Sequence, residues 1–152
     1  MIGIDPGKMG AVASIDHGVL RVWKMPDTPG GLAALLERLD GPVVVELVGS
    51  GGNANKEGRR MGATSAFTFG CGFGVILGVL AGTGRVAELV RPPKWTRAMG
   101  LRGATKHAHT ELARRLYPTC QLNGADKPKR ITHYAADAVL LAEYGRQLRG
   151  DR

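Results

Sequence analysis

The alternation of apolar and polar positions predicts that the chain begins with three short strands. These strands cover Met1–Asp5, Ala11–Asp16 and Val19–Met25. Pro6-Gly7 ends the first strand, and His17-Gly18 forms a tight turn between the second and the third. Two later apolar runs, residues 43–48 (VVVELV) and residues 85–90, predict a fourth and a fifth strand.

Helical periodicity occupies the segments between and after these later strands. The first predicted helix is the short amphipathic segment at residues 32–39, whose leucines share one face. Further helices are predicted over residues 61–84, 105–116 and 131–148. This order of elements predicts an α/β fold, a mixed five-stranded sheet flanked by helices, within one domain that spans residues 1–152.

The segment between Arg60 and Arg85, MGATSAFTFGCGFGVILGVLAGTG, contains no charged residue. It is long enough to cross a bilayer, and it repeats a glycine at every fourth position. These glycines are Gly70, Gly74, Gly78 and Gly82. Because the segment is also rich in Gly, Ser and Thr, the preferred interpretation is a buried helix rather than a membrane span. Its small-residue stripe would allow the backbone of the sheet, of another helix or of a partner subunit to approach closely.

Composition and charge add a partner to this picture. The 152 residues are 43% hydrophobic and 22% charged, which is typical of a globular protein. Lys and Arg outnumber Asp and Glu by 21 to 13, and the resulting net charge of +8 favours a polyanion, nucleic acid before an acidic membrane. Cys71 and Cys120 form neither a disulfide framework nor a metal-site spacing, so a reducing cytoplasm is expected. Because Met1 opens directly into a strand, no signal peptide is expected.

Three acidic residues stand in or beside apolar segments. Asp5 ends the first strand, Glu46 interrupts the run of valines at residues 43–48, and Asp137 lies within ITHYAADAVLLAEYG. Each has an ordinary explanation: Asp5 as a turn residue that bonds its own backbone, and Glu46 as a strand end that reaches solvent. His133 precedes Asp137 by four residues, so a helix would place both on one face, although a lone helical histidine is more often structural.

One divalent cation would solve the problem that the three acids share. An unpaired carboxylate in an apolar setting costs several kcal/mol or shifts its pKa. Oxygen ligands suit Mg²⁺ or Mn²⁺, and a pair of such ions supports in-line displacement at phosphorus. Together with the basic charge, this pattern points to a nuclease that binds two Mg²⁺ ions per site, with Mn²⁺ as a substitute.

Four segments resemble those of the RuvC-like Holliday-junction resolvases, within the RNase H-like nucleases, and of their short phage-borne members above all. The segments are IGIDPGKMGAVA, VVVELV, FTFGCGFGVILGVLAGTG followed by RPPKW, and HYAADAVLLAEYG. They occur in the family's order and span nearly the whole chain. The resemblance implies an RNase H-like fold and metal-dependent cutting of branched DNA by a homodimer, in a bacterial or phage-infected cytoplasm. It implies no nucleotide cofactor and no membrane partner.

The resemblance also implies roles for individual residues. Asp5, Glu46 and Asp137 match the family's acidic metal ligands. The position three before Asp137 is Tyr134, which is no Mg²⁺ ligand, so His133 is the choice for the fourth ligand or for the base that activates water. Asp126 is a less favoured candidate for this fourth ligand, because it lies outside the predicted helix.

Basic residues complete the assignment that follows from the resemblance. Lys106 matches a basic position that the family places near the scissile phosphate, with a solvated helix-face lysine as the alternative. The Gly70, Gly74, Gly78 and Gly82 stripe is assigned to the dimer interface. In the Gly-rich loop GSGGNANKEGRRMG at residues 49–62, Met61 is the one candidate for a residue that wedges into the junction. DNA contacts are assigned to Lys8, Lys56, Arg59, Arg60, Met61, Lys94, Lys106, Lys127, Lys129 and Arg130.

Three other functions compete with this interpretation. A related nuclease could act on other DNA or RNA structures with the same residues. A monomeric state would favour this alternative over a resolvase, because a monomer makes single nicks. A protein that binds branched DNA without cutting it would follow if Tyr134 weakens the metal site. An ATP-handling protein of the broader fold group would need further Gly-rich phosphate loops after other strands, and the sequence has no matching second one.

Overall fold

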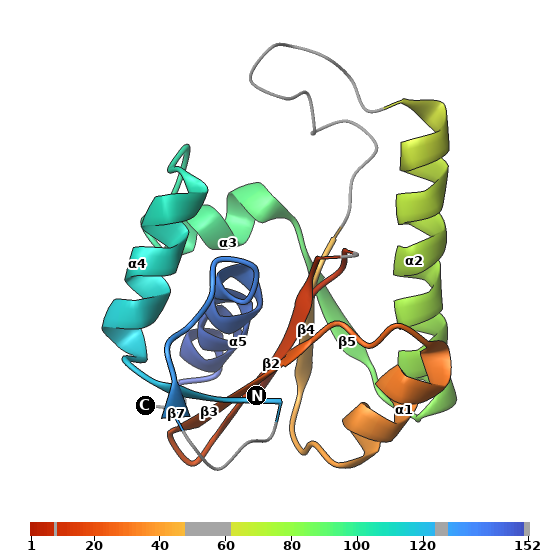
Figure 1. Cartoon of the computed structure of the whole chain (residues 1–152), viewed down its shortest axis with the longest axis horizontal. Coiled ribbons are helices and arrows are strands. Elements are labelled where there is room, and N and C mark those ends of the chain that lie inside the picture. Colours follow the sequence, from red (N-terminus) through yellow and green to blue (C-terminus); the bar gives the residue numbers. More distant parts are fainter. Residues whose placement is uncertain (8, 48–61, 124–127, 151–152) are drawn as a thin grey trace.

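The computed structural model describes residues 1–7, 9–47, 62–123 and 128–150. Within these residues, seven strands form one sheet in the order β5-β4-β1-β2-β3-β6-β7 (Figure 1). The strands are β1 (Ile2–Asp5), β2 (Ala11–Asp16), β3 (Val19–Lys24), β4 (Val43–Glu46), β5 (Ala87–Val90), β6 (Cys120–Leu122) and β7 (Pro128–Lys129). Strands β1, β2 and β3 pair antiparallel, whereas β4 pairs parallel with β1 and β5 parallel with β4. The predicted mixed sheet flanked by helices is confirmed.

Two short strands extend the five that the sequence predicts. β6 and β7 fall in the segment 120–130, for which the sequence pattern predicts neither a strand nor a helix. β6 pairs parallel with β3 through Arg21 with Gln121 and Val22 with Leu122, and β7 pairs antiparallel with β6. A strand of three residues is too short to show alternation in the sequence, and it forms here because the edge of β3 offers backbone partners.

The five helices of the described residues are α1 (Pro29–Glu37), α2 (Ala63–Gly82), α3 (Pro92–Ala98), α4 (Lys106–Leu116) and α5 (Ala136–Leu148). The sequence pattern does not predict helix α3, because Pro92-Pro93 follows directly on the strand predicted at residues 85–90 and by itself indicates only the end of that strand. Proline is, however, favoured in the first turn of a helix, where its missing N–H leaves no bond unmade. The predicted start of the last helix at Ile131 is wrong, since α5 begins at Ala136.

Alternate residues of the central strands pack against two layers of helices. On one face, Ile2 and Ile4 of β1 share a buried cluster with residues of α1 and α2. On the other face, Val44 of β4 packs with α5, α3 and α4, and α5 lies along the sheet in Figure 1. The sheet is therefore buried between helices on both sides, as its run of valines requires.

Gly3 sets the depth at which α5 crosses β1. A methyl group added at Gly3 would collide with the backbone oxygen of Ala138 and with the backbone nitrogen of Ala142. No other residue type fits this crossing without moving the helix. The close approach places the first turn of α5 beside the carboxyl end of β1.

The prediction that the uncharged helix is buried is wrong for this chain taken alone. Helix α2 stands beside α1 in Figure 1 and buries only Ile76 and Leu80, while Phe67 remains 75% exposed. A Cβ added at Gly70, Gly74, Gly78 or Gly82 would meet no atom within 4 Å. The lack of charge suggested burial, but the glycine face of the helix packs against nothing in the described chain. In that part of the chain α2 alone is long and apolar enough to cross a membrane by length and composition.

Candidate functional site

The parallel pairing of β1 and β4 brings two of the predicted acids to one edge of the sheet. Ile4 lies opposite Val45, so the next residues along the two strands are Asp5 and Glu46. Both strands end at these acids, and both side chains are partly buried. The apolar residues before each acid form the two strands. Asp5 and Glu46 are the last residues of these strands, so their carboxylates lie at the carboxyl ends.

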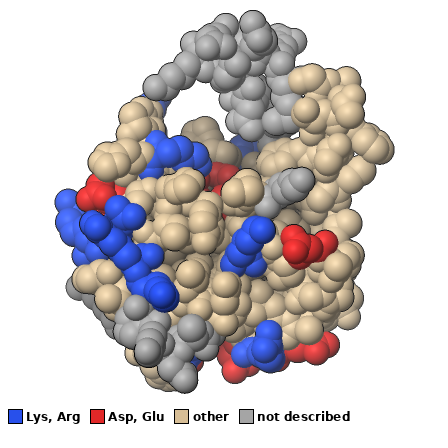
Figure 2. All heavy atoms as spheres, viewed as in Figure 1, with Lys and Arg blue, Asp and Glu red and all other residues tan. Residues whose placement is uncertain are grey.

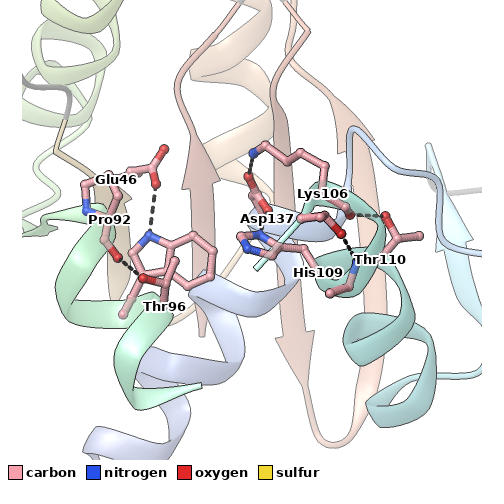
Figure 3. Close-up of polar contacts among 10 residues, drawn as sticks. Glu46, Pro92, Thr96, Lys106, His109, Thr110 and Asp137 are labelled. Atoms are coloured by element: carbon pink, nitrogen blue, oxygen red, sulfur yellow. Dashed lines mark hydrogen bonds and ion pairs between the residues drawn. The ribbon is translucent and has the colours of Figure 1, made fainter. Parts of the chain in front are cut away.

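The third acid reaches the same place from a helix. Asp137 lies in the first turn of α5 and is only 3% exposed. Its Oδ1 lies 2.7 Å from Nδ1 of His109, and its Oδ2 forms an ion pair with Nζ of Lys106 (Figure 3). Both oxygens of this buried carboxylate therefore have a partner on α4.

The charges of the three acids act on one another. Burial, together with the charges of Glu46 and Asp137, raises the pKa of Asp5 to about 7. Burial also raises the pKa of Glu46, against the hydrogen bond from Trp95 and with the charge of Asp137. Burial opposes the ionisation of Asp137 as well, but its hydrogen bonds from His109 and Lys106 outweigh that cost and lower its pKa. Ionisation of one carboxylate thus makes ionisation of the others less favourable. Of the three, Asp137 alone has a lowered pKa, so it is the acid that stays ionised.

Two aromatic side chains that the sequence interpretation missed lie beneath these carboxylates. Trp95, on α3, donates from Nε1 to Oε1 of Glu46 at 2.9 Å. The ring of Trp95 meets the ring of His109 edge to face, with centroids 5.5 Å apart and planes at 75°. These contacts join Glu46 to Asp137 through the two rings. The signals in the sequence were a tryptophan just after Pro92-Pro93 and a histidine one helical turn after Lys106.

His133 lies elsewhere than the i, i+4 argument placed it. It falls in the turn that precedes α5, and its ring contacts that of Tyr134 with centroids 5.7 Å apart. Within the described residues His133 has no recorded contact with Asp137, and His109 makes that contact instead. The role of His133 as a metal ligand or base, which the resemblance implies, stays a prediction, whereas its expected helical pairing with Asp137 is wrong.

A pocket of about 400 Å³ opens beside Lys106 and is lined by α4 and by residues 132 and 133. Its lining consists of Lys106, His107, Thr110, Arg114, Thr132 and His133. Arg114 is held by the backbone oxygen of Ile131 and by Glu111, at 3.0 and 3.1 Å. His133 therefore faces a space next to the carboxylate cluster, with Lys106 between the two.

The basic residues assigned to DNA separate into two groups. Lys8, Lys56, Arg59, Arg60, Met61 and Lys127 lie outside the described residues, as does Asp126. Lys94 on α3, Lys129 on β7 and Arg130 are exposed. Figure 2 shows Lys and Arg side chains gathered on the side of the molecule where α4 lies. This face borders the carboxylate cluster through Lys106.

The carboxylate cluster suits a hard divalent cation by its chemistry. Three oxygen-ligand side chains lie near one edge of the sheet, and burial, together with the charges of the neighbouring acids, raises the pKa values of Asp5 and Glu46. As the side chains stand, however, no three His, Cys, Asp or Glu residues in the described part of the chain converge closely enough to hold a metal. Lys106 pairs with Oδ2 of Asp137, whereas His109 contacts Oδ1. A cation could therefore bind Oδ2 only after Lys106 moves away from it.

Comparisons with known proteins show the fold. Searches against protein-family models and against curated proteins find no match. Among solved structures, the chain is similar to "T. thermophilus RuvC in complex with Holliday junction substrate", with a TM-score of 0.61 and 17% identity over 99% of this chain and 96% of that one. It is also similar to "Thermus thermophilus RuvC structure", with a TM-score of 0.56 and 19% identity over the same shares. The chain therefore has the RuvC variant of the RNase H-like fold, as the sequence resemblance implied.

Proposed function

We propose that this chain, which has the fold of RuvC, is a Mg²⁺- or Mn²⁺-dependent endonuclease that resolves four-way or other branched DNA by paired nicks. The observation that carries the proposal is the meeting of Asp5, Glu46 and Asp137 at one edge of the sheet, with Lys106 on Asp137. The net charge of +8 and the basic side of α4 supply the attraction for a DNA backbone.

The carboxylates would hold the metal ions and orient the attacking water. Such ions supply a Lewis acid for the scissile phosphate and lower the pKa of bound water. Asp137 remains ionised because His109 and Lys106 stabilise its charge, so it could bind a cation without losing a proton once Lys106 leaves Oδ2. Asp5, whose pKa is raised by burial and by the charges of Glu46 and Asp137, would give up its proton in binding a cation. Lys106, once released from Asp137, would neutralise charge that develops on the phosphate.

Paired nicks need two sites related by symmetry, and α2 supports a homodimer. Its glycine stripe is open, and Phe67 lies exposed on the same helix. Packing of this face against a second copy would bury apolar surface and bring the two backbones close. A two-fold dimer would then present one carboxylate cluster to each of two opposed strands.

The proposal is tested by cleavage of a synthetic four-way junction beside a linear duplex of the same sequence. We expect paired nicks on the junction alone in Mg²⁺ or Mn²⁺, and we expect Asp137→Asn to bind the junction without cutting it. Equal cutting of the linear duplex would replace the proposal with a general nuclease.

A non-cleaving binding protein is the second candidate, and the geometry of Asp137 favours it. Both oxygens of this carboxylate are occupied by His109 and Lys106, and Tyr134 stands where the resemblance places a fourth ligand. Tight junction binding with no product in either metal would support this candidate, because Mn²⁺ tolerates an imperfect ligand set better than Mg²⁺ does.

A further inference from the structure

We infer that Trp95 and His109 are positioning residues of the proposed metal site, each fixing one oxygen of a carboxylate so that the other faces the cation. The inference rests on the proposed function, because it assigns these rings to the same site. It adds two residues that carry no oxygen ligand and that belong to α3 and α4, outside the strands that bear Asp5 and Glu46.

The first half of the arrangement concerns Glu46. Its Oε1 accepts the indole N–H of Trp95 at 2.9 Å, and the ring that donates is 1% exposed. Because an indole N–H can only donate, this contact fixes which oxygen of Glu46 points down to the ring. In Figure 3 the second oxygen of Glu46 takes no part in this bond.

The second half repeats the pattern on Asp137. Nδ1 of His109 lies 2.7 Å from Oδ1, and an ionised carboxylate only accepts, so Nδ1 is the protonated nitrogen. The side chain of His109 is 9% exposed, whereas that of Lys106 on Oδ2 is 74% exposed. The imidazole is therefore fixed by its surroundings, while the lysine can move away when a cation approaches.

The two rings also fix the distance between the two carboxylates. Trp95 and His109 touch edge to face at 5.5 Å, which links α3 to α4. Glu46, Trp95, His109 and Asp137 thus form one continuous chain of contacts from β4 to α5. Residues that hold metal ligands from behind in this way contribute about 10- to 100-fold to metal affinity.

The test is a Mn²⁺ titration of the whole protein by calorimetry, with three variants. Trp95→Phe keeps an aromatic ring but removes the N–H, and His109→Leu removes the donor to Asp137. His109→Asn keeps an N–H donor near the position of Nδ1. Trp23→Phe on β3 and His107→Leu on the exposed side of α4 are the matched controls.

We expect Trp95→Phe and His109→Leu to weaken Mn²⁺ binding about 10-fold or more, and His109→Asn to restore most of it. The controls should bind as the parent does, and thermal unfolding without metal should show that every variant folds. Parent-like affinity in both Trp95→Phe and His109→Leu would overturn the inference while leaving the proposed function intact. Absence of Mn²⁺ binding by the parent would overturn both.

A second measurement does not depend on how the variants fold. The sequence contains two tryptophans, so the ¹⁵N-labelled parent gives two indole N–H signals. Saturating Mg²⁺ should shift the signal of Trp95, whose partner Glu46 binds the metal, and should leave that of Trp23 in place. Equal shifts, or none in a protein that binds Mg²⁺, would contradict a link between the indole and the site.

Discussion

At the scale of single residues, the energetic problem of the site lies at Asp5. Its pKa near 7 means that the metal-free folded protein binds a proton there that the unfolded chain, with a pKa near 3.8, releases. The folded state therefore binds more protons between these two values, and its free energy of unfolding falls as pH rises through that window. Above pH 7 the full cost of three neighbouring carboxylates is present.

Asp5→Asn should remove this cost. We expect the metal-free variant to melt several degrees above the parent at pH 8, because each kcal/mol corresponds to roughly 3 °C for a chain of this size. At pH 4 the two should melt together. Thermal unfolding in a chelator at both pH values is the measurement. The idea fails if the difference between the proteins is the same at pH 4 and at pH 8.

Lys106 offers a separate test of roles within the cluster. Lys106→Met should lower the cleavage rate about 100-fold at saturating metal, because a charge near the phosphate is lost. It should not weaken Mn²⁺ binding, since Lys106 competes with a cation for Oδ2 of Asp137. Rate constants and calorimetric affinities would be measured on the same preparations. A loss of Mn²⁺ affinity with an unchanged rate would contradict this division of roles.

The sequence reveals the acids of the site but not the side chains that hold them. Glu46 stands out because an acid within a run of valines is unusual, and Asp137 because alanines and leucines surround it. His109 and Trp95 look like ordinary core residues, since nothing local indicates what a ring touches across the fold. The resemblance singles out His133 because Tyr134 is no Mg²⁺ ligand, whereas the expected helical pairing of His133 with Asp137 fails because the helix starts only at Ala136.

At the scale of elements, the crossing of α5 over β1 positions the site. Gly3→Ala would push the new methyl group into the backbone of α5 at Ala138 and Ala142. We expect the free energy of unfolding to fall by about 2 to 3 kcal/mol and metal affinity to fall with it, because Asp137 moves away from Asp5. Chemical denaturation and Mn²⁺ titration are the two measurements.

Gly30→Ala in the first turn of α1 is the control for that change. An added methyl group there meets no atom within 4 Å. Its stability should stay within about 1 kcal/mol of the parent, with unchanged metal affinity. Equal losses in the two variants would show that the close approach at Gly3 has no special importance.

Elements with strong periodicity were predictable and elements with only tertiary causes were not. Strand β2 has the bounds that alternation predicts, and α4 begins after Thr105, whose side chain accepts from the backbone N–H of Ala108. Helix α3 and strand β6 depend on two prolines at a helix start and on the free edge of β3. Helix α2 was correctly predicted as a helix, but its burial was inferred from an uncharged sequence rich in Gly, Ser and Thr, which does not say what packs against it.

At the scale of the whole molecule, the proposed paired nicks require two copies of the chain. Gly74→Glu adds a charge to the open face of α2 where no atom of the described chain would clash. We expect the parent to sediment as a dimer and this variant as a folded monomer, measured by analytical ultracentrifugation. Leu148→Glu, at a 54% exposed position of α5, should remain dimeric. A monomeric parent at micromolar concentration would contradict the proposed dimer.

We propose that this protein resolves junctions by paired, metal-dependent nicks. A supercoiled plasmid that extrudes a cruciform distinguishes such paired nicks from single ones. Two nicks in opposed strands within one binding event convert the plasmid to a linear product, whereas a single nick gives an open circle. We expect linear product in Mg²⁺ with the parent protein and none with Asp5→Asn. Open circles alone, or no product in either Mg²⁺ or Mn²⁺, would contradict it.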